Sequence, residues 1–259
     1  MKASTMRELL VQAEETWGDG VVIRYKSGKG TVAEKSYTDL RKDSEHFSDL
    51  LETLKVRGGH VALIGPTSYE WILSYFGTVN SGSVAVPLDA SLPAADVCEL
   101  VDRADAVVLV ADEARKDVLE AARIQCPKLR YLISMQKTED GDGILALPKL
   151  MEMTLEEMEP GTGARADLQP DQLASILFTS GTTGKSKGVM LTHRNLAENA
   201  TCLDMKFPER SVLLSVLPVH HAYCLSMDIL KGISSGSVIC INDSLFRMAA
   251  NIKLFRPNI

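Results

Sequence analysis

The sequence lacks the features that mark several large classes of protein. Basic residues are in the minority: 28 Lys and Arg stand against 34 Asp and Glu, for a net charge of −6. This balance gives no general attraction to DNA or to anionic lipid, so nucleic acid is not an expected partner. No apolar run approaches the roughly 20 residues of a transmembrane segment, and the first residues lack the apolar core of a signal peptide.

Cysteine at metal-binding or redox spacing is also absent. The cysteines are Cys98, Cys126, Cys202, Cys224 and Cys240. They form no Cys-x-x-Cys pair and have no histidine at ligand spacing, which predicts buried reduced thiols in a cytoplasmic protein. The acidic cluster at 156–159 is interpreted as a solvated face. The sequence therefore nominates no metal-ligating residue.

What is present is an alternation of strand and helix patterns. Apolar residues make up 45% of the chain and charged residues 24%, which is ordinary for a globular protein. Strands are expected at 21–25, 60–64, 84–88 and 106–110, and helices at 6–17, from about 38, around 71–79 and at 94–103. Continuous β-branched runs favour strands buried on both faces. The predicted fold class is therefore α/β, with doubly wound, mostly parallel sheets and flanking helices.

The pattern predicts two segments. The first, 1–172, is an α/β subdomain that ends in an acidic surface excursion at 136–172, with one short helix around 151–157. The second, 173–259, carries a glycine-rich loop and the start of a second α/β subdomain. Its expected elements are a helix capped by Thr192 and strands at 212–216 and 237–241.

The stretch from Thr179 to Gly188 says most about chemistry. Strand-like residues flank it on both sides, and its ten residues are three glycines, five serine or threonine residues and two lysines. Glycine permits close backbone approach, so amide hydrogens can converge on one anion. Hydrogen bonds to a charged group are each worth roughly 1.5–3 kcal/mol. The stretch therefore predicts a loop that holds a polyphosphate.

A Walker A loop is the nearest alternative, because Gly184-Lys185-Ser186 matches the end of that motif. The motif requires a further glycine five positions before Gly184, and that position is Thr179. It also requires a helix directly after the loop, whereas Gly188 begins a strand-like run. A P-loop kinase or NTPase is thus kept as an alternative function.

Four motifs together resemble the adenylate-forming, or AMP-binding, superfamily. Residues 176–184, with Lys187-Gly188-Val189 and 192–195, are similar to its signature sequence. Residues 35–40, 82–89 and 217–223 resemble the first, second and fourth motifs of the same superfamily. The motifs occur in the family order and cover most of the chain. The closest resemblance is to the N-terminal part of acyl-CoA synthetases such as long-chain-fatty-acid–CoA ligases.

The resemblance implies that a fatty or other carboxylate is activated with ATP to acyl-AMP and then passed to a thiol. The implied cofactors are ATP, Mg²⁺ and coenzyme A, or the phosphopantetheine of a carrier protein. It implies that Lys187 pairs with the β- and γ-phosphates and that His221 lines the acyl-carboxylate site, which makes these the candidate catalytic residues. The implied ATP-binding residues are Thr179, Ser180, Gly181, Thr182, Thr183, Gly184 and Lys187.

The chain also departs from the family pattern. It stops at Ile259, before the family's adenine motif, its hinge and its C-terminal domain with a further catalytic lysine. The resemblance therefore implies a missing C-terminal domain of the same protein as a partner, and a chain that is inactive alone. A non-catalytic nucleotide-binding relative is the second alternative. Cys224 stands where many members have glycine, which bears on the width of the acyl tunnel.

Overall fold

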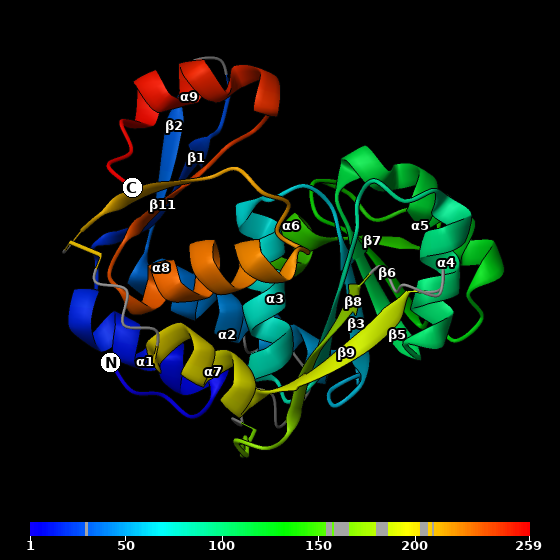
Figure 1. Ribbon diagram of the computed structural model, residues 1–259. Coiled ribbons are helices and arrows are strands. Elements are labelled where there is room, and N and C mark those ends of the chain that lie inside the picture. Colours follow the sequence, from blue (N-terminus) through cyan, green and yellow to red (C-terminus); the bar gives the residue numbers. More distant parts are fainter. Residues whose placement is uncertain (29–30, 154–156, 158–165, 180–185, 203–206, 209) are drawn as a thin grey trace.

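The computed structural model contains two mostly parallel β-sheets flanked by helices (Figure 1). It describes residues 1–28, 31–153, 157, 166–179, 186–202, 207–208 and 210–259. The predicted fold class is confirmed.

The α-helices are α1 (Met6–Trp17), α2 (Tyr37–Thr53), α3 (Tyr69–Asn80), α4 (Ala94–Arg103), α5 (Lys116–Gln125), α6 (Leu147–Met151), α7 (His193–Cys202), α8 (Gly232–Ser234) and α9 (Met248–Phe255). Three helical segments of other types are η1 (Glu113–Arg115), η2 (Cys224–Lys231), which is a π-helix, and η3 (Leu245–Arg247). The strands are β1 (Val21–Lys26), β2 (Val32–Ser36), β3 (His60–Ile64), β4 (Val84–Leu88), β5 (Ala106–Ala111), β6 (Tyr131–Ser134), β7 (Ile144–Ala146), β8 (Leu173–Thr179), β9 (Lys187–Thr192), β10 (Val212–Ser215) and β11 (Val238–Ile241).

The larger sheet has β3 at its centre. Within the described residues its strand order is β7-β6-β5-β3-β4-β8-β9, parallel except for the antiparallel β8–β9 pair. Val61 and Leu63 of β3 face the cluster that α2 and α3 contribute to, whereas Ala62 and Ile64 face α4 and α5. Helices therefore cover both faces, which explains why the strand sequences are apolar throughout.

The smaller sheet has the order β10-β11-β1-β2 in the described part of the chain. β11 lies parallel to both β10 and β1, and β2 is antiparallel to β1. Each sheet takes strands from both sides of residue 172. The division of the chain into 1–172 and 173–259 stays a prediction.

Two short strands and one helix differ from the sequence interpretation. The three-residue strand β7 lies inside the segment interpreted as a surface excursion, where it pairs in parallel with β6. The helix predicted around 151–157 lies partly outside the described residues, and the described residues 152 and 153 are not helical. The helix of this segment is α6, Leu147–Met151. Pro148 sits in its first turn, where the missing N–H costs no hydrogen bond. β2, at the sheet edge, was not predicted, because its residues are partly buried or exposed and none is buried.

His193 joins α7 to α1. Its imidazole is fully buried, and its Nδ1 accepts a hydrogen bond from the Met6 N–H at 3.3 Å. Burial, together with the nearby Arg7 guanidinium, lowers the pKa of His193 to about 4. The folded protein therefore requires a neutral imidazole at this position.

We expect His193 to make the fold sensitive to mild acid. The pKa of an unfolded histidine is about 6.5. As the pH falls from about 6.5 toward about 4, the unfolded chain therefore binds a proton at His193 that the folded chain does not bind. The free energy of unfolding should fall across that window. Urea unfolding at several pH values measures it, and His193→Gln should flatten the slope. An equal slope in the variant would contradict this account.

Candidate nucleotide and acid site

The predicted phosphate loop is carried by the β8–β9 hairpin. Thr179 pairs with Lys187 and Phe178 with Gly188 in antiparallel register, so both ends of the loop are held by the sheet edge. Ser180, Gly181, Thr182, Thr183 and Gly184 lie outside the described residues. Thr179 and Lys187 are exposed, and the Thr179 hydroxyl donates to the Lys187 carbonyl at 3.4 Å.

Gly188 allows β9 to pack closely against β8. A Cβ added at this position would lie 2.9 Å from Cγ2 of Ile176 on the neighbouring strand. A larger residue would push β9 away from β8, and the pairing that holds the loop ends would loosen.

Two cations lie beside the loop. Lys187 is exposed, and its ammonium has no hydrogen-bond or ion-pair partner among the described residues, so it is available to an anion. Arg103, at the end of α4, donates to the Ser186 carbonyl at 2.8 Å and lies 5.7 Å from the Phe178 ring centre. Sequence reasoning missed Arg103, because nothing in the local sequence of α4 indicates that it reaches a loop 83 residues away.

His221 lies in the turn that follows β10. Its side chain is exposed, and its Nδ1 accepts a hydrogen bond from the Tyr223 N–H at 3.3 Å. Nε2 therefore carries the hydrogen of the neutral ring, and it has no partner in the part of the chain that the structure describes. This arrangement suits donation of one hydrogen bond to a carboxylate oxygen.

The adjacent His220 is less exposed than His221 and contacts an acidic residue of the larger sheet. Its Nε2 lies 3.5 Å from Oδ1 of Asp89, which follows β4 in the larger sheet. Burial lowers the pKa of His220, and the opposing effect of the Asp89 carboxylate does not overcome it. His220 is thus a neutral contact between the two sheets.

A hollow of about 450 Å³ lies where the carboxyl ends of four strands meet. Its lining includes Gly65, Asp89, Leu217, His220, Asn242 and Leu245, which follow β3, β4, β10 and β11. Ligands of α/β sheets commonly bind outside the carboxyl ends of strands. Thr179, Lys187 and His221 do not line this hollow. Among the described residues no hydrogen bond or ion pair joins Thr179 or Lys187 to His221.

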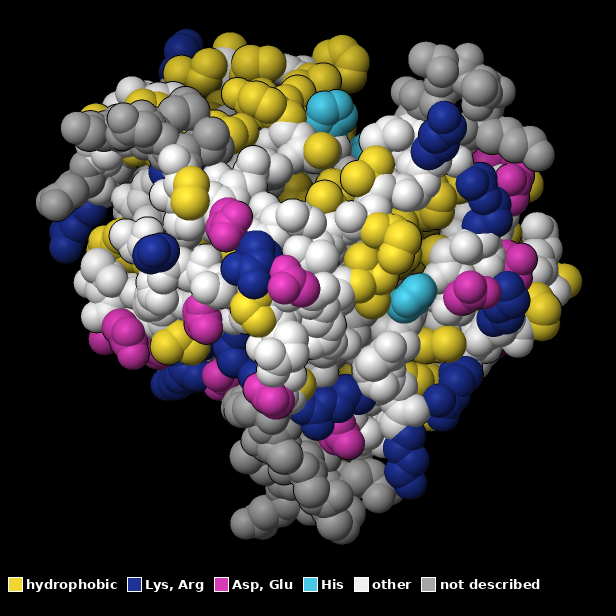
Figure 2. Space-filling model, turned by 60° about the horizontal axis from the view of Figure 1, so that its bottom comes forward, with side chains coloured by type: hydrophobic (Ala, Val, Ile, Leu, Met, Phe, Trp, Pro, Cys, Tyr) yellow, Lys and Arg dark blue, Asp and Glu magenta, His cyan; other side chains and the backbone are white. Residues whose placement is uncertain are grey.

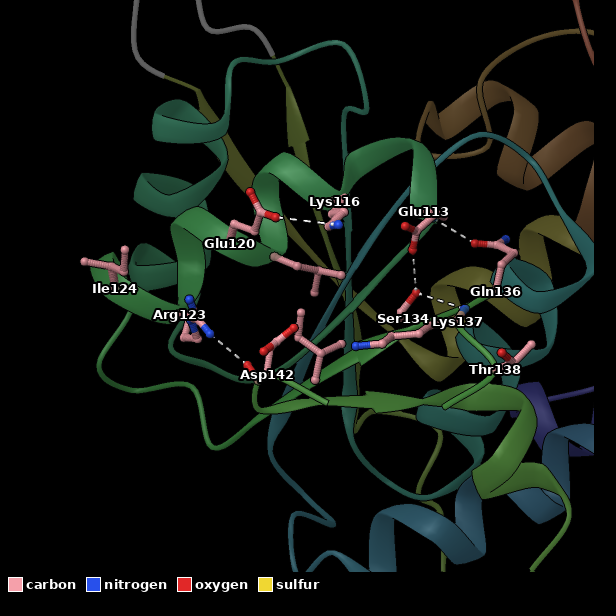
Figure 3. Close-up of a pocket in the computed structure, with 12 residues that line it drawn as sticks. Glu113, Lys116, Glu120, Arg123, Ile124, Ser134, Gln136, Lys137, Thr138 and Asp142 are labelled. Atoms are coloured by element: carbon pink, nitrogen blue, oxygen red, sulfur yellow. Dashed lines mark hydrogen bonds and ion pairs between the residues drawn. The ribbon is translucent and has the colours of Figure 1, made fainter. Parts of the chain in front are cut away.

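A second hollow, of about 770 Å³, lies between α5 and the β6–β7 segment (Figure 3). Its charged side chains mostly satisfy one another or backbone carbonyls: Lys116 lies 3.9 Å from Glu120, and Arg123 donates to the Asp142 carbonyl at 2.9 Å. None of the predicted site residues lines it. We therefore place the candidate site at the hairpin and the fourth motif.

Figure 2 shows one face of the described part of the molecule. Basic and acidic side chains are interspersed there, and a group of hydrophobic side chains gathers at the top left of the view. None of the helices in the described ranges combines the length and the hydropathy needed to cross a membrane.

Comparison with known proteins defines the family. The sequence matches the AMP-binding enzyme family over residues 10–259, so the chain belongs to that family. It is 28% identical over 243 residues to a crotonobetaine/carnitine–CoA ligase of Escherichia coli, covering 91% of this chain and 46% of that protein. It is 29% identical over 216 residues to 4-coumarate–CoA ligase 1 of Narcissus pseudonarcissus, covering 80% of this chain and 38% of the relative.

Solved structures show the same fold. The N-terminal domain of FACL13 from Mycobacterium tuberculosis, with a bound inhibitor, aligns with a TM-score of 0.80 at 22% identity, over 97% of this chain and 60% of that one. The anthranilate–CoA ligase AuaEII, in complex with anthranoyl-AMP, aligns with a TM-score of 0.84 at 18% identity, over 98% and 48%. The chain spans about half the length of the curated relatives it matches.

A half-buried acid, Asp228, lies next to the fourth motif. Asp228, on the π-helix η2, accepts a hydrogen bond from the Ser215 hydroxyl at 2.9 Å and lies 3.6 Å from Sγ of Cys224. Burial raises the pKa of Asp228 and raises the pKa of the Cys224 thiol to about 12. Cys224 is fully buried and donates to the Leu217 carbonyl at 3.1 Å. Its thiol therefore packs inside the motif.

We expect Asp228→Asn to stabilise the fold at neutral pH. The pKa of Asp228 is higher in the folded state than in the unfolded state, so ionisation of the carboxyl costs stability as the pH rises through the folded value. An amide keeps the Ser215 hydrogen bond without that cost. Urea unfolding should show a gain at pH 7 that disappears below the unfolded pKa, about 3.9. A variant that is less stable at pH 7 would contradict this interpretation.

Proposed function

We propose that this chain is the ATP- and acid-binding part of an adenylate-forming acid–thiol ligase. The observation that carries the proposal is the β8–β9 hairpin, in which Thr179 pairs with Lys187 at the two ends of a glycine- and hydroxyl-rich sequence. Membership of the AMP-binding enzyme family supports it.

The proposed reaction begins with attack of a carboxylate oxygen on the α-phosphorus of ATP. An oxygen–phosphorus bond forms, and pyrophosphate leaves with its electron pair. The enzyme must align the two reactants and neutralise the charge of the triphosphate. We assign the second task to residues 179–184 and Lys187, and orientation of the carboxylate to His221. In the second step a thiol of coenzyme A, or of a carrier-protein phosphopantetheine, attacks the acyl carbon and AMP leaves.

Mg²⁺ bound to the triphosphate would supply further charge neutralisation. The described residues contain no group of three or more His, Cys, Asp or Glu side chains able to hold an ion by themselves. Magnesium commonly keeps several waters and binds through one or two carboxylates and the phosphates of the substrate. We therefore assign no residue of this chain to the ion.

For the acid we propose a fatty substrate, in a cytoplasmic enzyme. The hydroxyl-rich form of the loop and the run from Val189 to His193 resemble fatty-acyl synthetases, and a solved structure named as a fatty acyl-CoA synthetase shares the fold with a TM-score of 0.78. The names of other relatives refer to carnitine and coumarate. The substrate class that these relatives and the proposal share is a carboxylic acid.

We expect Lys187 to be required for activation of the acid. In a ligase that contains residues 1–259, Lys187→Ala should reduce acid-dependent ATP–pyrophosphate exchange by about tenfold or more. The reason is that a charge-assisted contact to phosphate is lost. The matched control is Lys185→Ala, two residues earlier, where we expect little change. Equal losses in the two variants would show that general positive charge, and not Lys187, matters. Phosphate release without exchange would favour the kinase or NTPase alternative.

Residues 1–259 alone are expected to form no acyl-adenylate and to bind ATP weakly at best. The reason is that the adenine motif and the C-terminal lysine of the family pattern are not in this sequence. The measurement is exchange with the isolated chain over a panel of fatty acids. Robust exchange would refute the expectation, and tight ATP binding without exchange would favour a non-catalytic relative.

A further inference from the structure

A small hollow lies at the amino-terminal ends of strands in the smaller sheet, away from the carboxyl ends where the fourth motif follows β10. Its volume is about 210 Å³, and it is formed by the end of α1 and the amino-terminal ends of β1 and β11, which lie together at the left of Figure 1. Its lining includes Trp17, Arg24, Arg210 and the mostly buried Tyr37, together with Val21 and Val238. Of these residues only Tyr37 lies within a family motif, and the proposed reaction uses none of them.

Two aromatic rings form a fixed wall. The ring centres of Trp17 and Tyr37 are 5.2 Å apart with their planes inclined by 40°. The Tyr37 hydroxyl donates to the Ser237 carbonyl at 2.9 Å, which fixes that ring. Gly236 allows the indole to lie against the backbone, because a Cβ there would be 2.5 Å from Cε2 of Trp17. The wall is therefore built by packing and is not a chance exposure of one side chain.

The hollow also presents donors that the protein does not use. Arg24 is paired with Glu34 at 2.7 Å. Arg210 is exposed, and in the described ranges it has no hydrogen-bond or ion-pair partner. The Trp17 indole N–H likewise has no acceptor among the described residues. Asp19 is exposed nearby in the sequence but does not line the hollow. The lining charges thus leave one guanidinium in excess.

We propose that this hollow binds a small aromatic anion, with one planar ring against Trp17 and Tyr37 and a carboxylate on Arg210. Aromatic rings prefer tilted or offset contacts of the kind these walls offer, and a guanidinium matches a carboxylate in shape and charge. The volume suits a single ring with its carboxylate and is too small for a nucleotide. This inference does not rest on the proposed ligase function.

Benzoate is the probe, and the indole N–H signals in a ¹H–¹⁵N spectrum are the readout. The chain has only two tryptophans, Trp17 and the fully buried Trp71, and Trp17→Phe assigns the signals. We expect benzoate to shift the Trp17 signal saturably and to leave the Trp71 signal in place. Benzamide, which has the ring without the charge, and inorganic phosphate, which has charge without the ring, should bind more weakly.

Arg210→Gln should weaken benzoate binding about tenfold or more, since it removes a charge-assisted hydrogen bond. The matched control is Arg247→Gln, whose side chain is 67% exposed and lies outside the hollow; it should bind benzoate like the original chain. An unmoved Trp17 signal, or equal affinity in Arg210→Gln, overturns the proposal. If benzoate instead perturbs signals around His221 alone, this inference fails while the proposed function stands.

Discussion

The antiparallel pairing of β8 with β9 is the interaction on which the candidate site depends. It adds one reversed strand to an otherwise parallel sheet, and its register sets Thr179 opposite Lys187. A loop closed at both ends by ladder hydrogen bonds loses less entropy when it wraps a ligand than a loop with free ends. Arg103 adds a second constraint from α4 through the Ser186 carbonyl. The rest of the fold supports this hairpin by burying β8 against β4.

The candidate site also depends on the approach of the larger and the smaller sheet to each other at the carboxyl ends of β3, β4, β10 and β11. His220 contacts Asp89 across that meeting, and His221 follows it into an exposed turn. Asp228 lies next to the turn on a π-helix, a rare form often found at functional sites, and accepts a hydrogen bond from Ser215. The buried Cys224 thiol packs within the motif, where a glycine would leave space, and its effect on the width of the acyl tunnel stays a prediction.

The alternation of strands and helices could be predicted because buried parallel strands are apolar on both faces, as in residues 60–64 and 84–88. β2 and β7 could not, because no residue of β2 is buried and β7 has only three residues, so neither strand shows a clear apolar pattern. Thr179, Lys187 and His221 were nominated from motifs, and their roles stay predictions. The contacts of Arg103 with Ser186 and of Asp89 with His220 could not be predicted, because each joins residues that are far apart in the sequence.

The central claim is that the loop between β8 and β9 grips the phosphates of ATP. A crystal structure of the complete protein with a non-hydrolysable ATP analogue tests it most directly. The account predicts that amide hydrogens of residues 180–184 and the Lys187 ammonium lie within hydrogen-bonding distance of the β- and γ-phosphate oxygens. A triphosphate bound elsewhere, with the amide hydrogens of the loop already paired to neighbouring backbone, would contradict it.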